Sequence, residues 1–179
     1  MKRGGVARME RSELNYFEQI FIALNRKRVK YLLIGGVAIN LYGIERMTAD
    51  VDLMLELEEN NLRKFVAAMG ALGYKPKVPV KAEDLISASK RQEWIREKGM
   101  TVFSFYHPKY PFRLVDVLIE TDVDFVSAYA KRTMLKTPGT VTPLADVDTL
   151  IALKTIADRP QDRADIEHLR RIGRYENKR

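Results

Sequence analysis

The feature that most limits how this chain can fold is an acid pair at the entrance of an apolar segment. Asp50 and Asp52 are separated by one residue, and residues 53–55 are all apolar. On a β-strand this spacing places both carboxylates on the same face. Neighbouring carboxylates in partly buried surroundings are unfavourable without a cation or hydrogen bonds. The pattern therefore predicts a buried strand over 50–55 that begins with a cation site.

A third acidic residue lies inside another apolar segment. Asp116 is flanked by apolar residues throughout 114–119, and a lone acid in a central strand needs a partner. Magnesium is a hard cation that is commonly held by a few carboxylates together with substrate phosphates. We therefore predict that Asp50, Asp52 and Asp116 bind Mg²⁺, and two such ions could share the acid pair.

Two glycines separate a short apolar strand, predicted over 31–34, from the start of a helix. Gly35 and Gly36 would let a phosphate approach the backbone amides closely. A tight turn between a strand and a helix explains the same pair, so the pair alone decides nothing. Together with the acid pair and Asp116, it indicates a site for phosphoryl transfer.

The remaining apolar periodicity predicts alternating helices and short strands. Helices are expected at 14–24, 58–72, part of 82–98, shortly after Asp124, and on both sides of Arg159-Pro160. Strands are expected at 74–80, 100–106 and 113–119, the last two as an antiparallel pair, with a turn region at 136–143. We therefore expect an α/β domain over 1–125 and a C-terminal helical subdomain over 126–179.

The composition excludes several kinds of chemistry. The chain has no cysteine, which removes disulfides, thiolate nucleophiles and cysteine-bound zinc or iron–sulfur sites. His107 and His168 have no metal-ligand spacing, and the sequence contains no GxSxG elbow or Walker lysine motif. No apolar run approaches the ~18–20 residues that span a bilayer, and the first residues lack the apolar region of a signal peptide. We therefore expect a cytoplasmic protein without a membrane partner.

The chain carries a net charge of +7, which favours a polyanionic partner if the basic residues cluster. Two clusters are present, one at 26–30 and one at 170–179. Both can instead be solvated helix ends, where cations suit the negative pole of the helix dipole. RNA, including tRNA, is therefore one candidate partner.

Three segments carry a resemblance to a known superfamily. Leu-Ile-Gly-Gly at 33–36, Thr-Ala-Asp-Val-Asp at 48–52 and Val-Asp-Val at 115–117 are similar to the nucleotidyltransferase superfamily shared with polymerase β. The closer likeness is to bacterial and archaeal nucleotidyltransferase-like proteins, including toxin components of abortive-infection systems. The resemblance implies an α+β fold of the polymerase β type, with a mixed β-sheet flanked by helices and a C-terminal helical subdomain.

The resemblance also implies roles for single residues. Asp50 and Asp52 would bind both Mg²⁺ ions, while Asp116 would serve the catalytic ion and activate the acceptor hydroxyl. Lys154 would contact the triphosphate, although a lysine in an apolar helix can also extend to solvent. The other candidates for nucleotide binding are Gly35, Gly36, Arg46 and Thr48.

The C-terminal part of the resemblance is less specific. Residues 150–154 with Arg159, Asp162 and Asp165 look like the C-terminal signature of these proteins. The last three residues could touch the nucleotide, but salt bridges that hold the two C-terminal helices together are the simpler explanation.

One departure from the family pattern bears on activity. Many active members carry Gly-Ser where this sequence has Gly35-Gly36, so a hydroxyl contact to the phosphates is missing. The main hypothesis is Mg²⁺-dependent transfer of a nucleoside monophosphate from an NTP such as ATP to a hydroxyl of an RNA 3′ end, a protein or a small molecule, with release of pyrophosphate. The protein could act in toxin–antitoxin or phage defence with an antitoxin or another partner protein.

The alternative hypothesis is a catalytically silent module of the same fold that binds nucleotide or RNA. Gly35-Gly36 in place of Gly-Ser favours this alternative. Retention of all three acids argues against it, because buried carboxylates cost stability.

Overall fold

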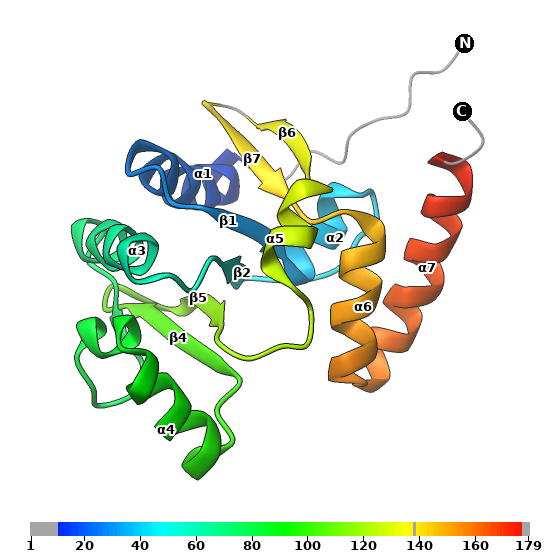
Figure 1. Ribbon diagram of the computed structural model, residues 1–179. Coiled ribbons are helices and arrows are strands. Elements are labelled where there is room, and N and C mark those ends of the chain that lie inside the picture. The colour runs from blue at the N-terminus through cyan, green and yellow to red at the C-terminus, as the bar shows by residue number, and fades with distance from the viewer. Residues whose placement is uncertain (1–10, 138, 177–179) are drawn as a thin grey trace.

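The computed structural model describes residues 11–137 and 139–176 (Figure 1). The helices are α1 (Arg11–Arg26), α2 (Gly35–Leu41), α3 (Glu59–Ala71), the 3-10 helix η1 (Ala82–Ile86), α4 (Ala88–Lys98), α5 (Phe125–Ala130), α6 (Val147–Ala157) and α7 (Pro160–Glu176). The strands are β1 (Tyr31–Ile34), β2 (Val51–Leu55), β3 (Lys75–Pro76), β4 (Val102–His107), β5 (Tyr110–Leu118), β6 (Thr133–Thr137) and β7 (Thr140–Leu144).

Within these described residues the strands form one seven-stranded sheet in the order β3-β4-β5-β2-β1-β7-β6. β1 runs parallel to β7 and β2 runs parallel to β5, whereas the other neighbours are antiparallel. The sheet is therefore mixed, and the predicted α+β fold is confirmed. β2 and β5, the strands that carry the acids, are neighbours in the middle of the sheet.

One face of the sheet packs against aromatic residues of α3 and α4. The ring of Phe105 on β4 meets Phe65 of α3 edge to face, with centroids 5.6 Å apart. Phe103 on the same strand stacks on Trp94 of α4 at 5.2 Å. Such rings bury large apolar areas and stabilise the core. Because side chains alternate along a strand, Ser104, which lies between these two phenylalanines, points to the opposite face.

That opposite face carries Asp52 and Asp116 and is called the acid face below. Figure 1 shows α1, α3 and α4 on one side of the strands and α2, α6 and α7 on the other. α6 and α7 lie side by side, as the sequence predicts for the two helices around Arg159-Pro160. Among the helices that the structure describes, none combines the length and apolar character that a bilayer crossing requires.

The segment expected to be a turn region, 136–143, is instead part of a β-hairpin. β6 and β7 pair from Thr133↔Leu144 to Thr137↔Thr140, and β7 also lies parallel to β1. Threonine and valine in these strands favour an extended backbone, and the hydrogen-bonding edge of β1 gives the hairpin a place in the sheet. The range 126–179 thus contributes two strands as well as helices, and the boundary at 125/126 stays a prediction.

Candidate active site

The three acids lie together at the centre of the acid face. Asp52 of β2 and Asp116 of β5 are paired in register on neighbouring parallel strands, so their Cα atoms are about 5 Å apart. Asp50 lies just before β2, and its Oδ1 accepts a hydrogen bond of 3.3 Å from the backbone N–H of Leu114 on β5. The fold therefore brings together the acids that the sequence analysis named.

Burial and mutual repulsion disfavour the ionised acids. Burial, followed by the negative charge of Asp116, raises the pKa of Asp52 to about 6, although the N–H of Gly36 donates to Asp52 Oδ2 at 3.3 Å. Burial also raises the pKa of Asp116, and a hydrogen bond from Ser104 opposes this shift. Among the described residues, Asp116 Oδ1 is buried without a hydrogen-bond partner. A buried carboxylate oxygen without a partner is costly, so the site favours a cation.

The donor set fits Mg²⁺ held jointly by protein and substrate. Mg²⁺ usually takes one or two carboxylates plus substrate phosphates and keeps several waters. Asp52 and Asp116 supply two carboxylates at adjacent positions, including the unpartnered Oδ1 of Asp116. Over residues 11–137 and 139–176, no three His, Cys, Asp or Glu side chains form a ready cage for a metal ion. Coordination completed by phosphates and water is compatible with that arrangement.

The raised pKa of Asp52 leads to a prediction about stability without divalent cations. Because the folded-state pKa, about 6, lies above the ordinary value, ionised Asp52 destabilises the fold at neutral pH. Asp52→Asn should therefore stabilise the protein by about 2–3 kcal/mol at about pH 7.5 in EDTA, and the gain should vanish near about pH 4, where Asp52 is protonated. Urea unfolding at both pH values measures this. The exposed Asp122→Asn is the control, and an equal gain at both pH values would contradict the electrostatic explanation.

The glycine corner is shaped by the residues that face it. Gly35 has a φ of +67°, which favours glycine, and a Cβ at this position would overlap Asp52 Oδ2. A Cβ at Gly36 would lie 2.7 Å from Thr48 Oγ1 and 2.9 Å from Thr48 Cβ. The space that a serine at position 36 needs is thus filled by Thr48, whose hydroxyl lies at the corner. This is the physical reason for glycine at both positions in this chain.

This packing predicts that the Gly-Ser arrangement is not tolerated here. Gly36→Ser should destabilise the protein by about 1–3 kcal/mol, because the new Cβ meets Thr48 and overpacking has such a cost. Gly70→Ser in α3 is the matched control, because nothing lies within 4 Å of a Cβ at that position. Thermal unfolding of both variants tests the idea. If Gly36→Ser is as stable as Gly70→Ser, Thr48 does not fill the corner.

A buried ionic network joins the segment before β2 to the C-terminal helices. Lys154 Nζ lies 2.7 Å from Asp162 Oδ1 and 2.7 Å from Asp165 Oδ2, and Arg46 Nη1 lies 2.6 Å from the same oxygen of Asp165. The side chain of Asn40 holds the backbone of Arg46 through two hydrogen bonds of 2.9 Å. Lys154 is only 8% exposed. The salt bridges considered for Asp162 and Asp165 are present, whereas a contact from Lys154 to triphosphate stays a prediction.

Three residues of this region were not named by sequence reasoning. Ser104 is paired in register with Asp116, Asn40 holds the loop at Arg46, and the backbone N–H of Lys77 donates to the carbonyl of Ser104 at 2.9 Å. Isolated serine, asparagine and lysine residues have no pattern that marks them in a sequence. Strand pairing places Ser104 and Lys77 on the acid face, whereas Asn40 lies on α2. Arg159, which was named, has an exposed side chain, and its backbone N–H donates to Asp162 Oδ2 at 3.2 Å.

Comparison with solved structures defines the class of fold. The chain is similar to a lincosamide antibiotic adenylyltransferase solved with lincomycin bound (16% identity, TM-score 0.56, 92% of this chain and 98% of that chain). It is also similar to ANT(2″)-Ia in complex with adenylyl-2″-tobramycin (13%, 0.57, 88% and 87%). A third similar structure is a Thermotoga maritima protein described as a nucleotidyltransferase (13%, 0.54, 98% and 100%). At these identities the likeness establishes the fold, which is that of nucleotidyltransferases.

The sequence match gives the family. Residues 21–173 match the family described as nucleotidyl transferase AbiEii toxin, type IV toxin–antitoxin system. Because this match covers most of the chain, the protein belongs to that family of nucleotidyltransferase toxins. Among curated proteins, no sequence matches the chain. The resemblance to nucleotidyltransferases and to their toxin members is therefore confirmed.

Proposed function

We propose that this protein transfers a nucleoside monophosphate from an NTP, with ATP as one candidate, to a hydroxyl acceptor and releases pyrophosphate. The observation that carries the proposal is the in-register pair of Asp52 and Asp116 with the buried, unpartnered Oδ1 of Asp116. Such a pair of buried carboxylates lowers the stability of the folded protein unless a cation or hydrogen bonds compensate it. It suits a site where Mg²⁺ and phosphate oxygens meet.

Asp50 and Asp52 would hold two Mg²⁺ ions, and Asp116 would hold the catalytic one. When bound, the ions supply charge stabilisation for the attacking and leaving oxygens of an in-line displacement at the α-phosphorus. Asp116 would orient the acceptor hydroxyl and take its proton. Burial raises the pKa of this carboxyl, which makes it a better proton acceptor than an ordinary aspartate.

The triphosphate would lie on the β1–β2 side of the acids. The N–H of Gly36 and the hydroxyl of Thr48 lie at the corner beside Asp52, and the absence of a side chain at Gly35 lets Asp52 lie against this corner. Thr48 would supply the hydroxyl that the Gly-Ser pattern places at position 36. Arg46 and Lys154 both pair with Asp165, so each would reach the phosphates by giving up that partner.

Membership in a toxin family supports a cognate antitoxin as the protein partner and a role in toxin–antitoxin or phage defence. We propose that this role is carried out in the cytoplasm. The similar ANT(2″)-Ia structure holds adenylyl-2″-tobramycin, which supports an NMP group as the transferred unit in this fold.

Transfer of label from α-labelled NTPs tests the proposal. Each NTP is incubated with Mg²⁺ and either bulk RNA or lysate, and wild type is compared with Asp50→Ala plus Asp52→Ala. We expect label on an acceptor and release of pyrophosphate with wild type only. The control is wild type in EDTA. Equal labelling by wild type and variant would place the chemistry elsewhere.

A silent module that binds nucleotide or RNA is the second candidate. The observation that favours it is the engagement of Lys154 by Asp162 and Asp165, which keeps this ammonium group from the triphosphate. Its distinguishing result is nucleotide binding by a folded protein without label transfer or pyrophosphate release for any NTP.

A further inference from the structure

A row of polar residues crosses the acid face from its centre to one edge. Asp52 pairs in register with Asp116, Asp116 pairs with Ser104 on β4, and the N–H of Lys77 donates to the carbonyl of Ser104. The pairings Lys75↔Tyr106 and Pro76↔Phe105 continue this register. The row therefore ends on exposed lysines at the edge strand, about 10 Å from Asp116 at two strand spacings.

The edge lysines face the acids. Pro76 lies opposite Phe105 on the packed face, so alternation directs Lys75 and Lys77, both exposed, to the acid face. The charge of Lys77 lowers the pKa of Asp116, which is consistent with an ammonium group on the same face. Neither lysine is engaged by a salt bridge among those that the structure describes.

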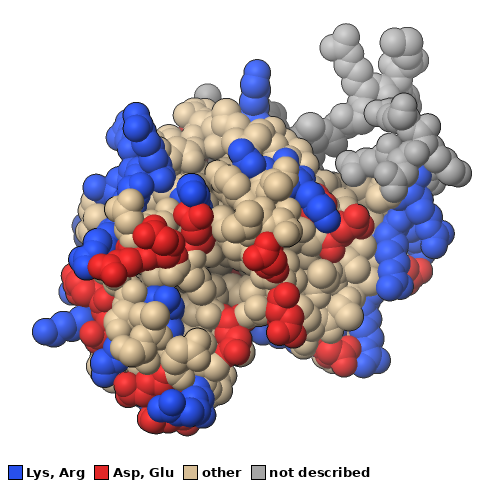
Figure 2. Space-filling view, viewed as in Figure 1, with Lys and Arg blue, Asp and Glu red and all other residues tan. Residues whose placement is uncertain are grey.

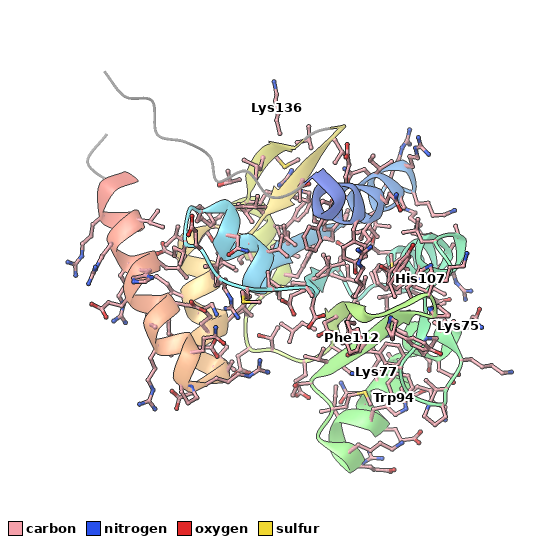
Figure 3. The ribbon with its side chains drawn as sticks, turned by 180° about the vertical axis from the view of Figure 1, so that it is seen from behind. Lys75, Lys77, Trp94, His107, Phe112 and Lys136 are labelled. Carbon is pink, nitrogen blue, oxygen red and sulfur yellow. The ribbon has the colours of Figure 1, made fainter. Side chains whose placement is uncertain are left out.

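An exposed aromatic ring stands on the same face. Along β5, alternation puts Leu114 on the face of Asp116, and the register with β4 shifts beyond the pair Tyr106↔Leu114. The guanidinium of Arg113 lies 4.8 Å over the ring of Tyr16 on α1, on the packed side of the sheet, so its neighbour Phe112 is directed to the opposite, acid face. Phe112 is 86% exposed, whereas a ring of this size is normally buried. Figure 3 shows Phe112, Lys75 and Lys77 on the β3–β4–β5 part of the molecule, while Lys136 projects from β6 at the opposite edge of the sheet.

These positions fix the side from which an acceptor would approach. The glycine corner and Thr48 adjoin Asp52 on the β1–β2 side, which the proposed function gives to the triphosphate. Asp116 lies on the other side of Asp52, and the sheet continues from there to β4 and β3. An acceptor hydroxyl at Asp116 would therefore belong to a molecule that lies over β5, β4 and β3.

We infer that this surface, made of Lys75, Lys77 and Phe112, binds the end of a single-stranded nucleic acid whose terminal hydroxyl lies at Asp116. The inference rests on the proposed nucleotidyl transfer. Lysines bind backbone phosphates, and an exposed aromatic ring stacks on a base regardless of its identity. Two cations and one aromatic ring at the end of the row of polar residues are complementary to a polyanion that carries flat bases.

The basic clusters apparent in the sequence do not form this surface. One lies at the end of α1, and the described part of the other, Arg170, Arg171 and Arg174, lies on α7, whereas residues 177–179 are outside the described residues. Figure 2 shows lysine and arginine side chains at these two separate sides of the molecule. Net charge alone therefore predicts that a polyanion binds, but it does not predict which surface of the protein the polyanion contacts. The surface of Lys75, Lys77 and Phe112 instead predicts that binding depends on three residues on the face of the acids.

Fluorescence anisotropy with a labelled single-stranded RNA of about 12 nucleotides, over a series of salt concentrations and without NTP, tests the inference. For Lys75→Ala plus Lys77→Ala we expect weaker binding and a slope of log K against log salt shallower by about 1.4, since each phosphate contact on a single strand contributes about 0.7. For Phe112→Ala we expect about 5- to 150-fold weaker binding with an unchanged slope. The same sequence made as DNA separates contacts to the 2′-hydroxyl from contacts to the shared backbone.

The matched control variants remove two lysines and one apolar side chain from a different part of the surface. Lys27→Ala plus Lys136→Ala removes two exposed lysines near the other edge of the sheet, and Met134→Ala removes a side chain that is 51% exposed on β6. Equal losses in the test and control variants, or no binding by wild type at low salt, would overturn the inference.

Label transfer separates this inference from the proposed function. If wild type labels a protein or a small molecule, and substitution of the three residues leaves the affinity for RNA and DNA unchanged, the inference fails and the proposed function stands. If the oligonucleotide binds through these residues but no NTP gives transfer, the surface is confirmed and the proposed function fails.

Discussion

Asp116→Asn is expected to reduce nucleotidyl transfer on the order of 10³-fold or more while leaving the protein folded. Asparagine keeps the shape of the side chain but removes the charge that holds a metal ion and accepts the proton of the acceptor hydroxyl. Because burial raises the pKa of Asp116, removing its charge should not destabilise the fold at neutral pH without metal. Single-turnover transfer of α-label, together with thermal unfolding, measures both effects.

The control for Asp116→Asn is the exposed Asp122→Asn, which should transfer label like wild type. Binding of NTP without metal should survive in Asp116→Asn, because the glycine corner is on the other side of Asp52. Retained transfer at more than about a tenth of the wild-type rate would remove Asp116 from the chemistry and leave the acid pair as the site.

Lys154→Met is expected to lower the free energy of unfolding by about 3–5 kcal/mol, the largest stability effect we predict. The ammonium lies 2.7 Å from both Asp162 and Asp165 in a site where all three side chains are buried. Removing one partner of a buried ionic network leaves uncompensated charge, which is costly. Arg46 would remain as a partner of Asp165, but Asp162 would keep only backbone contacts such as the N–H of Arg159.

Urea unfolding of Lys154→Met beside Lys90→Met gives the matched comparison. Lys90 pairs with Glu93 at 3.4 Å, with side chains 47% and 42% exposed, and removal of such a surface pair costs under about 1 kcal/mol. If Lys154→Met is as stable as Lys90→Met yet loses NTP binding, the lysine serves the triphosphate rather than the helix pair. A large loss of stability would show that its first role is to hold α6 to α7.

Much of the fold could be predicted because its patterns are local. The helix at 14–24 and the strand at 31–34 are periodic apolar segments, and both are present as α1 and β1. The hairpin of β6 and β7 was missed, because its residues are mixed and its stability depends on pairing with β1, which is more than 100 residues away in the sequence. A strand whose partner is distant leaves little trace in its own segment.

The candidate site was likewise predicted only in part from the sequence. The one-residue spacing of Asp50 and Asp52 and the apolar surroundings of Asp116 identified the acids from the sequence alone. The sequence did not show that Gly36 faces Thr48, or that Lys154 is engaged by two carboxylates. These contacts join the corner to the segment before β2 and α6 to α7, and no local pattern encodes them.

The sequence by itself determined which residues are the candidates for the chemistry, because residue type and alternation along a strand fix the charge and the face of each acid. Only the tertiary structure decided which neighbours these acids have. Parallel pairing of β2 with β5 set Asp52 beside Asp116, and the order of the strands placed Ser104 and then Lys77 on the outer side. The physical reason is that strand order and register are settled by packing of the whole sheet, which depends on all segments at once.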